Sequence, residues 1–344
     1  MAGSLYLLYC ETIQMAQTLL RRTLLFIAAS SIPILTIAQN TQKSEAPWPS
    51  RTVRILVGFP AGTSPDLVAR TLAEPLAKAL GQAVVVENRP GAGGNIAADL
   101  VAKSTDAHTL GVMINGNLTT ARLLNPATPF DPAKDLAPIS LVGTAPLVLV
   151  APANAPGSTA AEFFAAARTA GSSWSYGSPG VGTIGHIGME LLKVKSGMEA
   201  VHVPYPGYPQ VATAMIGGQI QLSLLPPALA QTQARAGRIK LLGVTSAGRS
   251  VFAPEVPSLS EAGIREYSLE IWNAVAGPIG LPKPVTVKLS ALLSEIARRP
   301  EVREKLFAQG WQVAGTSAEG LANRMKADTQ TMGAVIAKQG IKVE

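Results

Sequence analysis

Short apolar runs rich in β-branched residues alternate with helical stretches through most of this chain. Residues 53–57 (VRILV) have the pattern of a buried strand, and residues 66–80 have helical spacing with Gly81 directly after them. The same alternation continues almost to the C-terminus. Strands that alternate with helices of about 10–15 residues indicate βαβ units. The sequence therefore predicts an α/β fold with mostly parallel sheets flanked by helices.

The remaining predicted elements follow the same rhythm. The further strands are residues 83–87, 110–114, 147–151, 173–178, 200–203, 219–225 and 238–245. The further helices are residues 95–103, 158–169, 185–196, 211–216, 284–298, 300–309 and 317–339. At about 100–200 residues per domain, 344 residues fit two α/β units better than one large sheet. We predict one lobe from residues 51–143 and 268–344, and a second lobe from residues 144–267.

The N-terminal segment has the pattern of an export signal. Arg21 and Arg22 precede an apolar stretch, residues 23–38, which Pro33 interrupts and which ends in small residues. A membrane-spanning helix needs about 20 apolar residues, so a membrane anchor is the weaker alternative. We predict a signal peptide at residues 1–38 and a linker at residues 39–50.

Two details of this signal stay open. A start at Met15 gives a more conventional signal than a start at Met1. The arginine pair fits the twin-arginine route as well as the general secretory route. Either route places the protein in the periplasm.

Composition excludes several classes of protein. With 47% hydrophobic and 15% charged residues, the chain is not disordered. Its net charge is +7, but the positive residues are scattered, so nucleic acid is not a predicted partner. The single cysteine, Cys10, lies in the predicted signal, and the three histidines lack metal-ligand spacing. We predict no metal.

No cofactor is predicted either. The loop at residues 90–95 resembles a dinucleotide-binding loop, but Ile96 replaces its third glycine. No acidic residue follows at the distance that binding of a nicotinamide dinucleotide requires.

Three loops rich in Gly, Ser, Thr and Asn follow predicted strands. They are residues 62–66, residues 115–117 and residues 178–186. In α/β sheets, ligands bind beyond the carboxyl ends of the strands, and helix N-termini bind anions. The three loops together favour a small anionic ligand, with His186 as either a donor to it or a local cap. Tyr205 and Tyr208 are either walls of this site or surface turn residues, and Trp272 is predicted to pack in the core.

A hydrolase is the alternative from a different class. Ser178 and His186 could supply a nucleophile and a base, but Tyr176 stands where the nucleophile elbow needs glycine. The missing catalytic groups are evidence against an enzyme, and a secreted serine hydrolase is kept as an alternative.

Several segments together resemble the Bug family, the periplasmic receptors of tripartite tricarboxylate transporters. The resemblance covers roughly residues 47–340, and its most specific part is Glu87-Asn88-Arg89-Pro90-Gly91-Ala92-Gly93-Gly94. The other matching segments are residues 48–51, 59–62 with Asp66, 130–132, 178–186, 202–205, 217–219, 245–246, 254–257 and 261–263.

This resemblance implies a two-lobed periplasmic-binding-protein fold of type II-like form, with the ligand in the interdomain cleft. It implies capture of a small carboxylate, either an aromatic acid or an aliphatic di- or tricarboxylate, for delivery to the membrane permease subunits of such a transporter. A sensor of the same fold that feeds a signalling membrane protein is the runner-up. N–H donors, hydroxyls and bridging waters are expected to hold the carboxylate.

The sequence departs from the family pattern at Ala61, Thr63 and Leu225. Many members carry an acidic group at the position of Leu225, so an apolar or aromatic ligand body is favoured over an amino acid. The complete predicted site comprises Phe59, Pro60, Ala61, Gly62, Thr63, Asp66, Asn115, Asn117, Ser178, Gly182, Thr183, His186, Tyr205 and Leu225.

Overall fold

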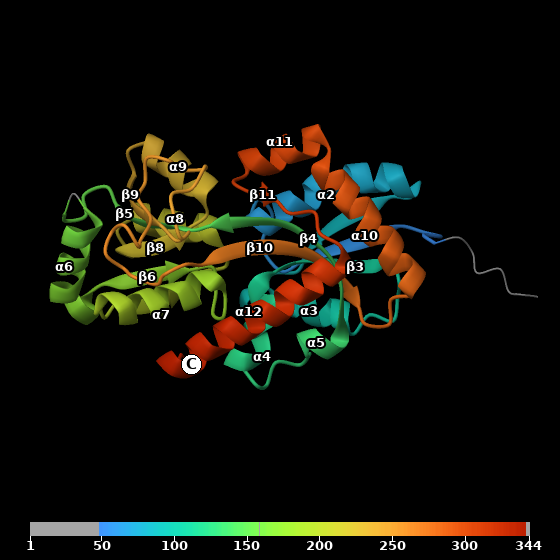
Figure 1. The fold of residues 1–344 in the computed structure, drawn as a ribbon, viewed down its shortest axis with the longest axis horizontal. Helices are drawn as coiled ribbons and strands as arrows, with labels where there is room; N and C mark the ends of the chain where they lie inside the picture. Colours follow the sequence, from blue (N-terminus) through green and yellow to red (C-terminus); the bar gives the residue numbers. More distant parts are fainter. Residues whose placement is uncertain (1–47, 158, 342–344) are drawn as a thin grey trace, which may run out of the picture. The chain divides into compact units, whose positions relative to one another are not determined.

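The computed structural model describes residues 48–157 and 159–341 (Figure 1). The predicted signal peptide at residues 1–38 and most of the predicted linker lie outside the described residues. Residues 47–344 form one compact unit. No helix among the described residues is long and apolar enough to cross a membrane.

The described chain forms a six-stranded sheet and a five-stranded sheet. The first has the order β11-β4-β10-β3-β1-β2, and the second β7-β6-β8-β5-β9. The six-stranded sheet contains β1 (Val53–Val57), β2 (Val84–Asn88), β3 (Thr109–Ile114), β4 (Leu136–Pro146), β10 (Glu270–Pro278) and β11 (Gln312–Val313). The five-stranded sheet contains β5 (Val148–Pro152), β6 (Ser175–Ser178), β7 (Val201–Pro204), β8 (Leu222–Leu225) and β9 (Ile239–Val244).

These two sheets confirm the predicted fold class, but each sheet is mixed rather than mostly parallel. β1 is parallel to β2 and β3, whereas β10 is antiparallel to β3 and β4. In the other sheet β6 is parallel to its neighbours and β5 is antiparallel to β8 and β9. The chain leaves the first sheet on β4 and returns on β10, so these two neighbours run in opposite directions.

Helices cover both faces of each sheet. They are α2 (Ser64–Leu80), α3 (Asn95–Ala102), α4 (Ala121–Leu124), α5 (Pro132–Asp135), α6 (Ala160–Ala170), α7 (Ile184–Ser196), α8 (Tyr208–Ile216), α9 (Pro227–Arg235), α10 (Lys283–Arg298), α11 (Pro300–Ala308) and α12 (Ala318–Gln339). Single turns occur at η1 (Ala92–Gly94), η2 (Gly116–Thr120) and η3 (Gly171–Ser173).

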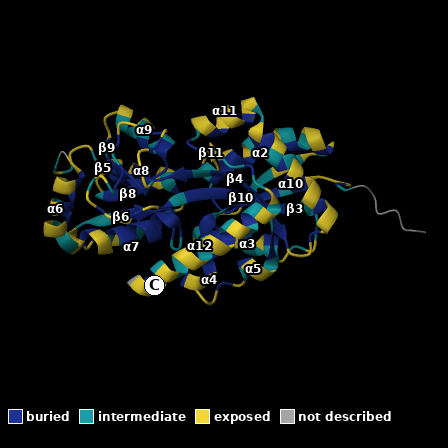
Figure 2. Ribbon diagram, in the orientation of Figure 1, coloured by how far each residue is buried: buried dark blue, intermediate teal, exposed yellow. Residues whose placement is uncertain are grey.

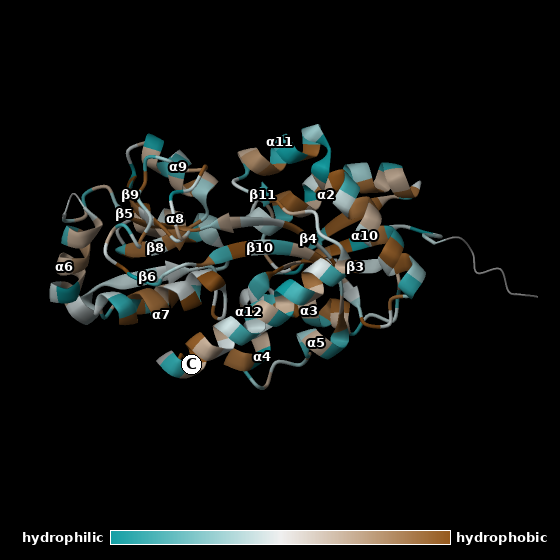
Figure 3. Ribbon diagram, viewed as in Figure 1, coloured by the Kyte–Doolittle hydropathy of each residue, from teal (hydrophilic) through white to brown (hydrophobic). Residues whose placement is uncertain are grey.

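The strands are buried and the helices are exposed on their outer sides (Figure 2). Successive side chains of β1 point to opposite faces of its sheet, as strand geometry requires. Ile55 packs in the cluster that includes α2 and α10, while Leu56 packs in the cluster that includes α3 and α12. Hydrophilic and hydrophobic residues alternate along α2, α10 and α12, as expected for helices that cover a sheet with one face (Figure 3).

One threonine ties together the two chain segments that connect the sheets. Thr245 follows β9, is fully buried, and exchanges backbone hydrogen bonds with Leu147, between β4 and β5, and with Leu269, before β10. Its hydroxyl also accepts from the Leu147 N–H at 2.8 Å and donates to the Leu269 carbonyl at 2.7 Å. Both crossings are therefore held at one point by four hydrogen bonds.

We predict that Thr245→Val lowers the free energy of unfolding by about 2–4 kcal/mol, because it leaves a buried N–H and a buried carbonyl short of a partner. Urea titration of the purified protein measures this change. Thr213→Val is the matched control, because the exposed Thr213 hydroxyl only donates to a carbonyl of its own helix. Equal effects of the two substitutions would contradict the prediction.

Candidate functional site

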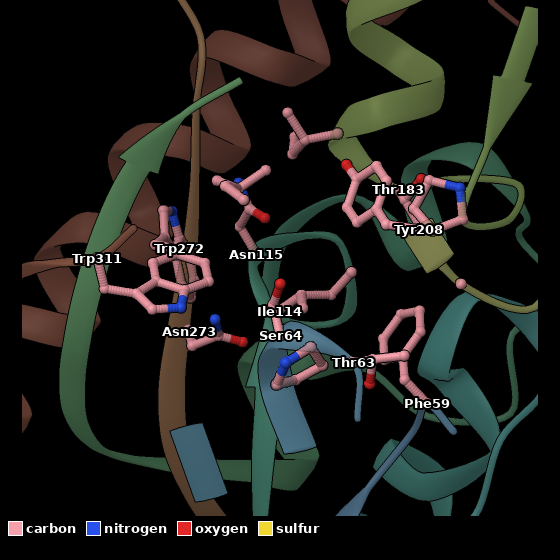
Figure 4. Close-up of a pocket in the computed structure, with 15 residues that line it drawn as sticks. Phe59, Thr63, Ser64, Ile114, Asn115, Thr183, Tyr208, Trp272, Asn273 and Trp311 are labelled. Carbon is pink, nitrogen blue, oxygen red and sulfur yellow. The ribbon is translucent and has the colours of Figure 1, made fainter. Parts of the chain in front are cut away.

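A narrow cavity lies where α2 and α7 begin, beside the ends of β3 and β10 (Figure 4). About 30 Å³ of it is open to the centre of a water molecule. Its lining residues are Phe59, Thr63, Ser64, Pro65, Ile114, Asn115, Pro179, Thr183, Ile184, Gly207, Tyr208, Ile271, Trp272, Asn273 and Trp311. Among these described residues none is charged, so an anion in the cavity has to be stabilised by dipoles.

Two helix N-termini supply such dipoles. Thr63 precedes α2 and Thr183 precedes α7, and both have extended backbone. The first N–H groups of a helix lack partners within it and carry partial positive charge. The N–H groups of Ser64 and Ile184, at the first helical positions, are therefore backbone donors available at the cavity.

The two threonine hydroxyls brace their loops instead of offering a donor to the cavity. Thr63 Oγ1 donates to the Pro60 carbonyl at 2.6 Å, and Thr183 Oγ1 donates to the Gly180 carbonyl at 2.8 Å. Thr183 Oγ1 also accepts from the His186 N–H. A hydroxyl has one proton, so neither can also donate to a ligand in this arrangement.

Asp66 stabilises the loop that precedes α2. Its carboxylate is 1% exposed and accepts hydrogen bonds from the Gly62 N–H, the Asn88 amide and the Arg70 guanidinium. Burial opposes ionisation, but these donors outweigh it and hold the pKa of Asp66 below its usual value. Asn88 also donates to the Phe59 carbonyl at 2.9 Å. The loop is thus fixed from both of its ends.

The glycines of the Pro-Gly-Ala-Gly-Gly segment allow two loops to touch. Gly93 has φ +61°, and a Cβ there would lie 2.7 Å from the Val181 carbonyl oxygen. Asn117 donates to the Gly93 carbonyl and to the Asn95 side chain. Asn117 and Gly182 line a second cavity, of about 200 Å³, and neither lines the first.

His186 stacks with the rings of Tyr176 and His202, next to the loop that precedes α7. Its Nδ1 accepts from the Gly182 N–H, and its ring lies 4.2 Å from the ring of His202. Ser178, which is fully buried, bonds to His202 Nε2 at 2.7 Å and makes no bond to His186. His186 therefore caps the loop locally, and the Ser178–His186 pair that the hydrolase alternative requires is not formed.

The structure brings four of the predicted residues to the first cavity: Phe59, Thr63, Asn115 and Thr183. Pro60, Ala61 and Gly62 lie in the adjoining loop but do not line the cavity. Tyr205 lines a separate hollow beside α8, and Leu225 is fully buried in the core of the five-stranded sheet. Leu225 therefore does not face the cavity, and it carries no information on the ligand body.

Several lining residues were not in the predicted site. Tyr208 was weighed only as an alternative wall, and Trp272 was predicted to pack in the core. Trp272 is indeed fully buried and packs there, but it also borders the cavity. Asn273 and Trp311 are absent from the predicted site, because no sequence pattern indicates that β10 pairs with β3 or that β11 pairs with β4.

The fold and this site define a two-sheet solute-binding protein, and the comparisons identify the family. Residues 68–341 match the model of the tripartite tricarboxylate transporter family receptor. BugT of Bordetella pertussis is 31% identical over 286 residues, covering 83% of this chain and 88% of BugT.

Solved structures agree. MatC from Rhodopseudomonas palustris with bound malate has a TM-score of 0.80 at 29% identity, covering 84% of this chain and all of that one. A second R. palustris protein, with adipate, has a TM-score of 0.82 at 29% identity, covering 86% of this chain and 99% of that one. The chain belongs to the tripartite tricarboxylate transporter receptor family, whose members are binding proteins rather than enzymes.

The histidine stack predicts a pH dependence of stability. Burial, followed by the neighbouring His186, lowers the pKa of His202 to about 4. The unfolded chain takes up this proton near pH 6.5, so stability that depends on neutral His202 is complete above that pH and is lost toward pH 4. We expect urea titrations to show this loss, and a smaller loss in His202→Gln. An identical pH profile in both proteins would contradict the assignment.

Proposed function

We propose that this protein captures a small carboxylate in the cavity at the start of α2 and α7 and delivers it to the membrane subunits of a tripartite tricarboxylate transporter. The observation that carries the proposal is that two helix N-termini open onto one cavity whose described lining has no charged side chain. Such N-termini favour an anion through their N–H groups and their dipoles. The malate and adipate bound by two relatives of the same fold support this ligand class.

Entry of the ligand requires the cavity to open. On this measure one water molecule needs about 10–15 Å³, so the 30 Å³ open to water centres has room for a few water molecules and not for a dicarboxylate. We infer that the parts predicted as lobes, residues 51–143 with 268–344 and residues 144–267, separate to admit it. Residues 1–38 would direct the protein to the periplasm, where such a receptor meets its ligand.

Removing one backbone N–H tests the role of the α2 N-terminus. We expect Ser64→Pro to weaken carboxylate binding at least fivefold, because proline has no N–H at this first helical position. The extended backbone of Thr63, with φ −77° and ψ 161°, already suits a following proline. Isothermal titration with malate, adipate, benzoate and 4-hydroxybenzoate measures the effect on whichever acids bind.

Two controls make this test specific. Ser64→Ala keeps the N–H and removes only the hydroxyl, so it is expected to retain affinity. Ala160→Pro makes the same change at the first position of α6, away from the cavity, and is expected to leave binding unchanged. Full affinity in Ser64→Pro, or binding by none of the acids in the parent protein, would overturn the proposal.

A further inference from the structure

One end of the cavity holds buried polar atoms that have no partner in the protein. Six buried side-chain atoms of the described residues lack a hydrogen bond, and four of them belong to residues that line this cavity. They are Asn115 Oδ1, Asn273 Nδ2, Asn273 Oδ1 and Trp311 Nε1. Asn115, Asn273 and Trp311 are only 2%, 1% and 2% exposed. Native proteins pair the large majority of such atoms, so this concentration indicates a place where a ligand completes the bonding.

The hydrogen-bonding character of each atom follows from its surroundings. Asn115 Nδ2 donates to the Glu270 carbonyl at 3.0 Å, which leaves Oδ1 as an acceptor. The indole N–H of Trp311 only donates. Both ends of the Asn273 amide are free, so it offers one donor and one acceptor in either orientation. Two donor nitrogens and two acceptor oxygens without a partner therefore belong to residues that line this part of the cavity.

The neighbouring tryptophan shows the contrast. Trp272 also lines the cavity, but its Nε1 donates to Asp328 at 2.7 Å. Figure 4 shows Trp272, Trp311 and Asn273 together on one side of the cavity, opposite Thr183 and Tyr208. The two tryptophans therefore differ: the indole N–H of Trp272 is already bonded within the protein, and that of Trp311 is not.

We propose that Asn115, Asn273 and Trp311 form a second subsite for an uncharged group that both donates and accepts hydrogen bonds, such as a carboxamide or hydroxyl. The inference rests on the proposed function: the carboxylate of the same ligand lies at the helix N-termini. The substrate class is then a monocarboxylate with an amide or hydroxyl at its other end. The aromatic rings of Phe59, Tyr208 and Trp272 suit an apolar body between the two groups.

Charged alternatives fit this subsite poorly. A second carboxylate only accepts, so it would face the Asn115 acceptor oxygen while losing its own hydration. An ammonium group needs acceptors only, and no described lining residue is acidic. A neutral group with both functions satisfies donors and acceptors together.

Matched sets of acids test the subsite. One set is succinamate, succinate and 4-aminobutanoate, and the other is 4-carbamoylbenzoate, terephthalate and 4-(aminomethyl)benzoate. Titration calorimetry on protein that has been unfolded and refolded to release bound ligand gives each dissociation constant. We expect the amide of a set to bind at least tenfold more tightly than the other two members.

The outcomes separate the two proposals. Tighter binding of a dicarboxylate or an amino acid overturns the subsite and leaves carboxylate capture standing. Binding of no member of either set, and of none of the four acids used with Ser64→Pro, overturns the proposed function and the subsite with it.

Two variants assign the preference to these side chains. Trp311→Phe removes one donor, and Asn273→Leu removes a donor and an acceptor at similar volume. Each is expected to reduce the preference for the amide at least fivefold, whereas a purely structural defect would weaken all members of a set alike. Asn323→Leu, at an exposed position of α12, is the control and should keep the preference. An unchanged preference in both cavity variants would overturn the assignment.

Discussion

The buried hydroxyl of Thr245 is the interaction on which the arrangement of this protein depends. Among the described residues, β4 leads from the six-stranded sheet to the other sheet and β10 leads back, and Thr245 bonds to the segments beside both. The two connections are held together at one buried point. This fixes the end of β4 and the start of β10 relative to each other beside the cavity. A movement that opens the cavity would then bend the chain near Thr245 instead of sliding one sheet along the other.

The loops at the cavity are rigid for a related reason. Asp66 and Asn88 hold the loop before α2, and His186 and Thr183 hold the loop before α7. These side chains use their hydrogen-bonding capacity within the loops, so backbone N–H groups are the donors that these two loops offer to the proposed ligand. Preorganised donors lose little entropy on binding, and they supply positive potential without a cation. An uncharged cavity of this kind also avoids burying an unpaired charge before the ligand arrives.

Local sequence patterns predicted most of the strands, most of the helix starts and the three loops, because each depends on neighbouring residues. They did not predict β4 or β10, whose pairing joins residues more than one hundred positions apart. The same limit explains why the predicted site differs from the lining of the cavity. Asn273 reaches the cavity through that pairing, and Trp311 lies next to β11, which pairs with β4. Leu225 is the last residue of β8 and packs in the core. Asp66 and His186 lie in the first turns of α2 and α7 and bond to the preceding loops, where Asn88 and His202 are their neighbours.

In the proposed binding mode, affinity and selectivity depend on different parts of the cavity. Helix N-termini attract any small carboxylate, since their N–H groups and dipoles respond to charge and not to the rest of the molecule. Selectivity has to come from groups that are left unsatisfied by the wrong ligand. A site built to bond a polar substituent rejects analogues without it far more strongly than an apolar pocket rejects a change in size. The unpartnered atoms of Asn115, Asn273 and Trp311 have this property, because a ligand that cannot bond to them leaves their burial uncompensated.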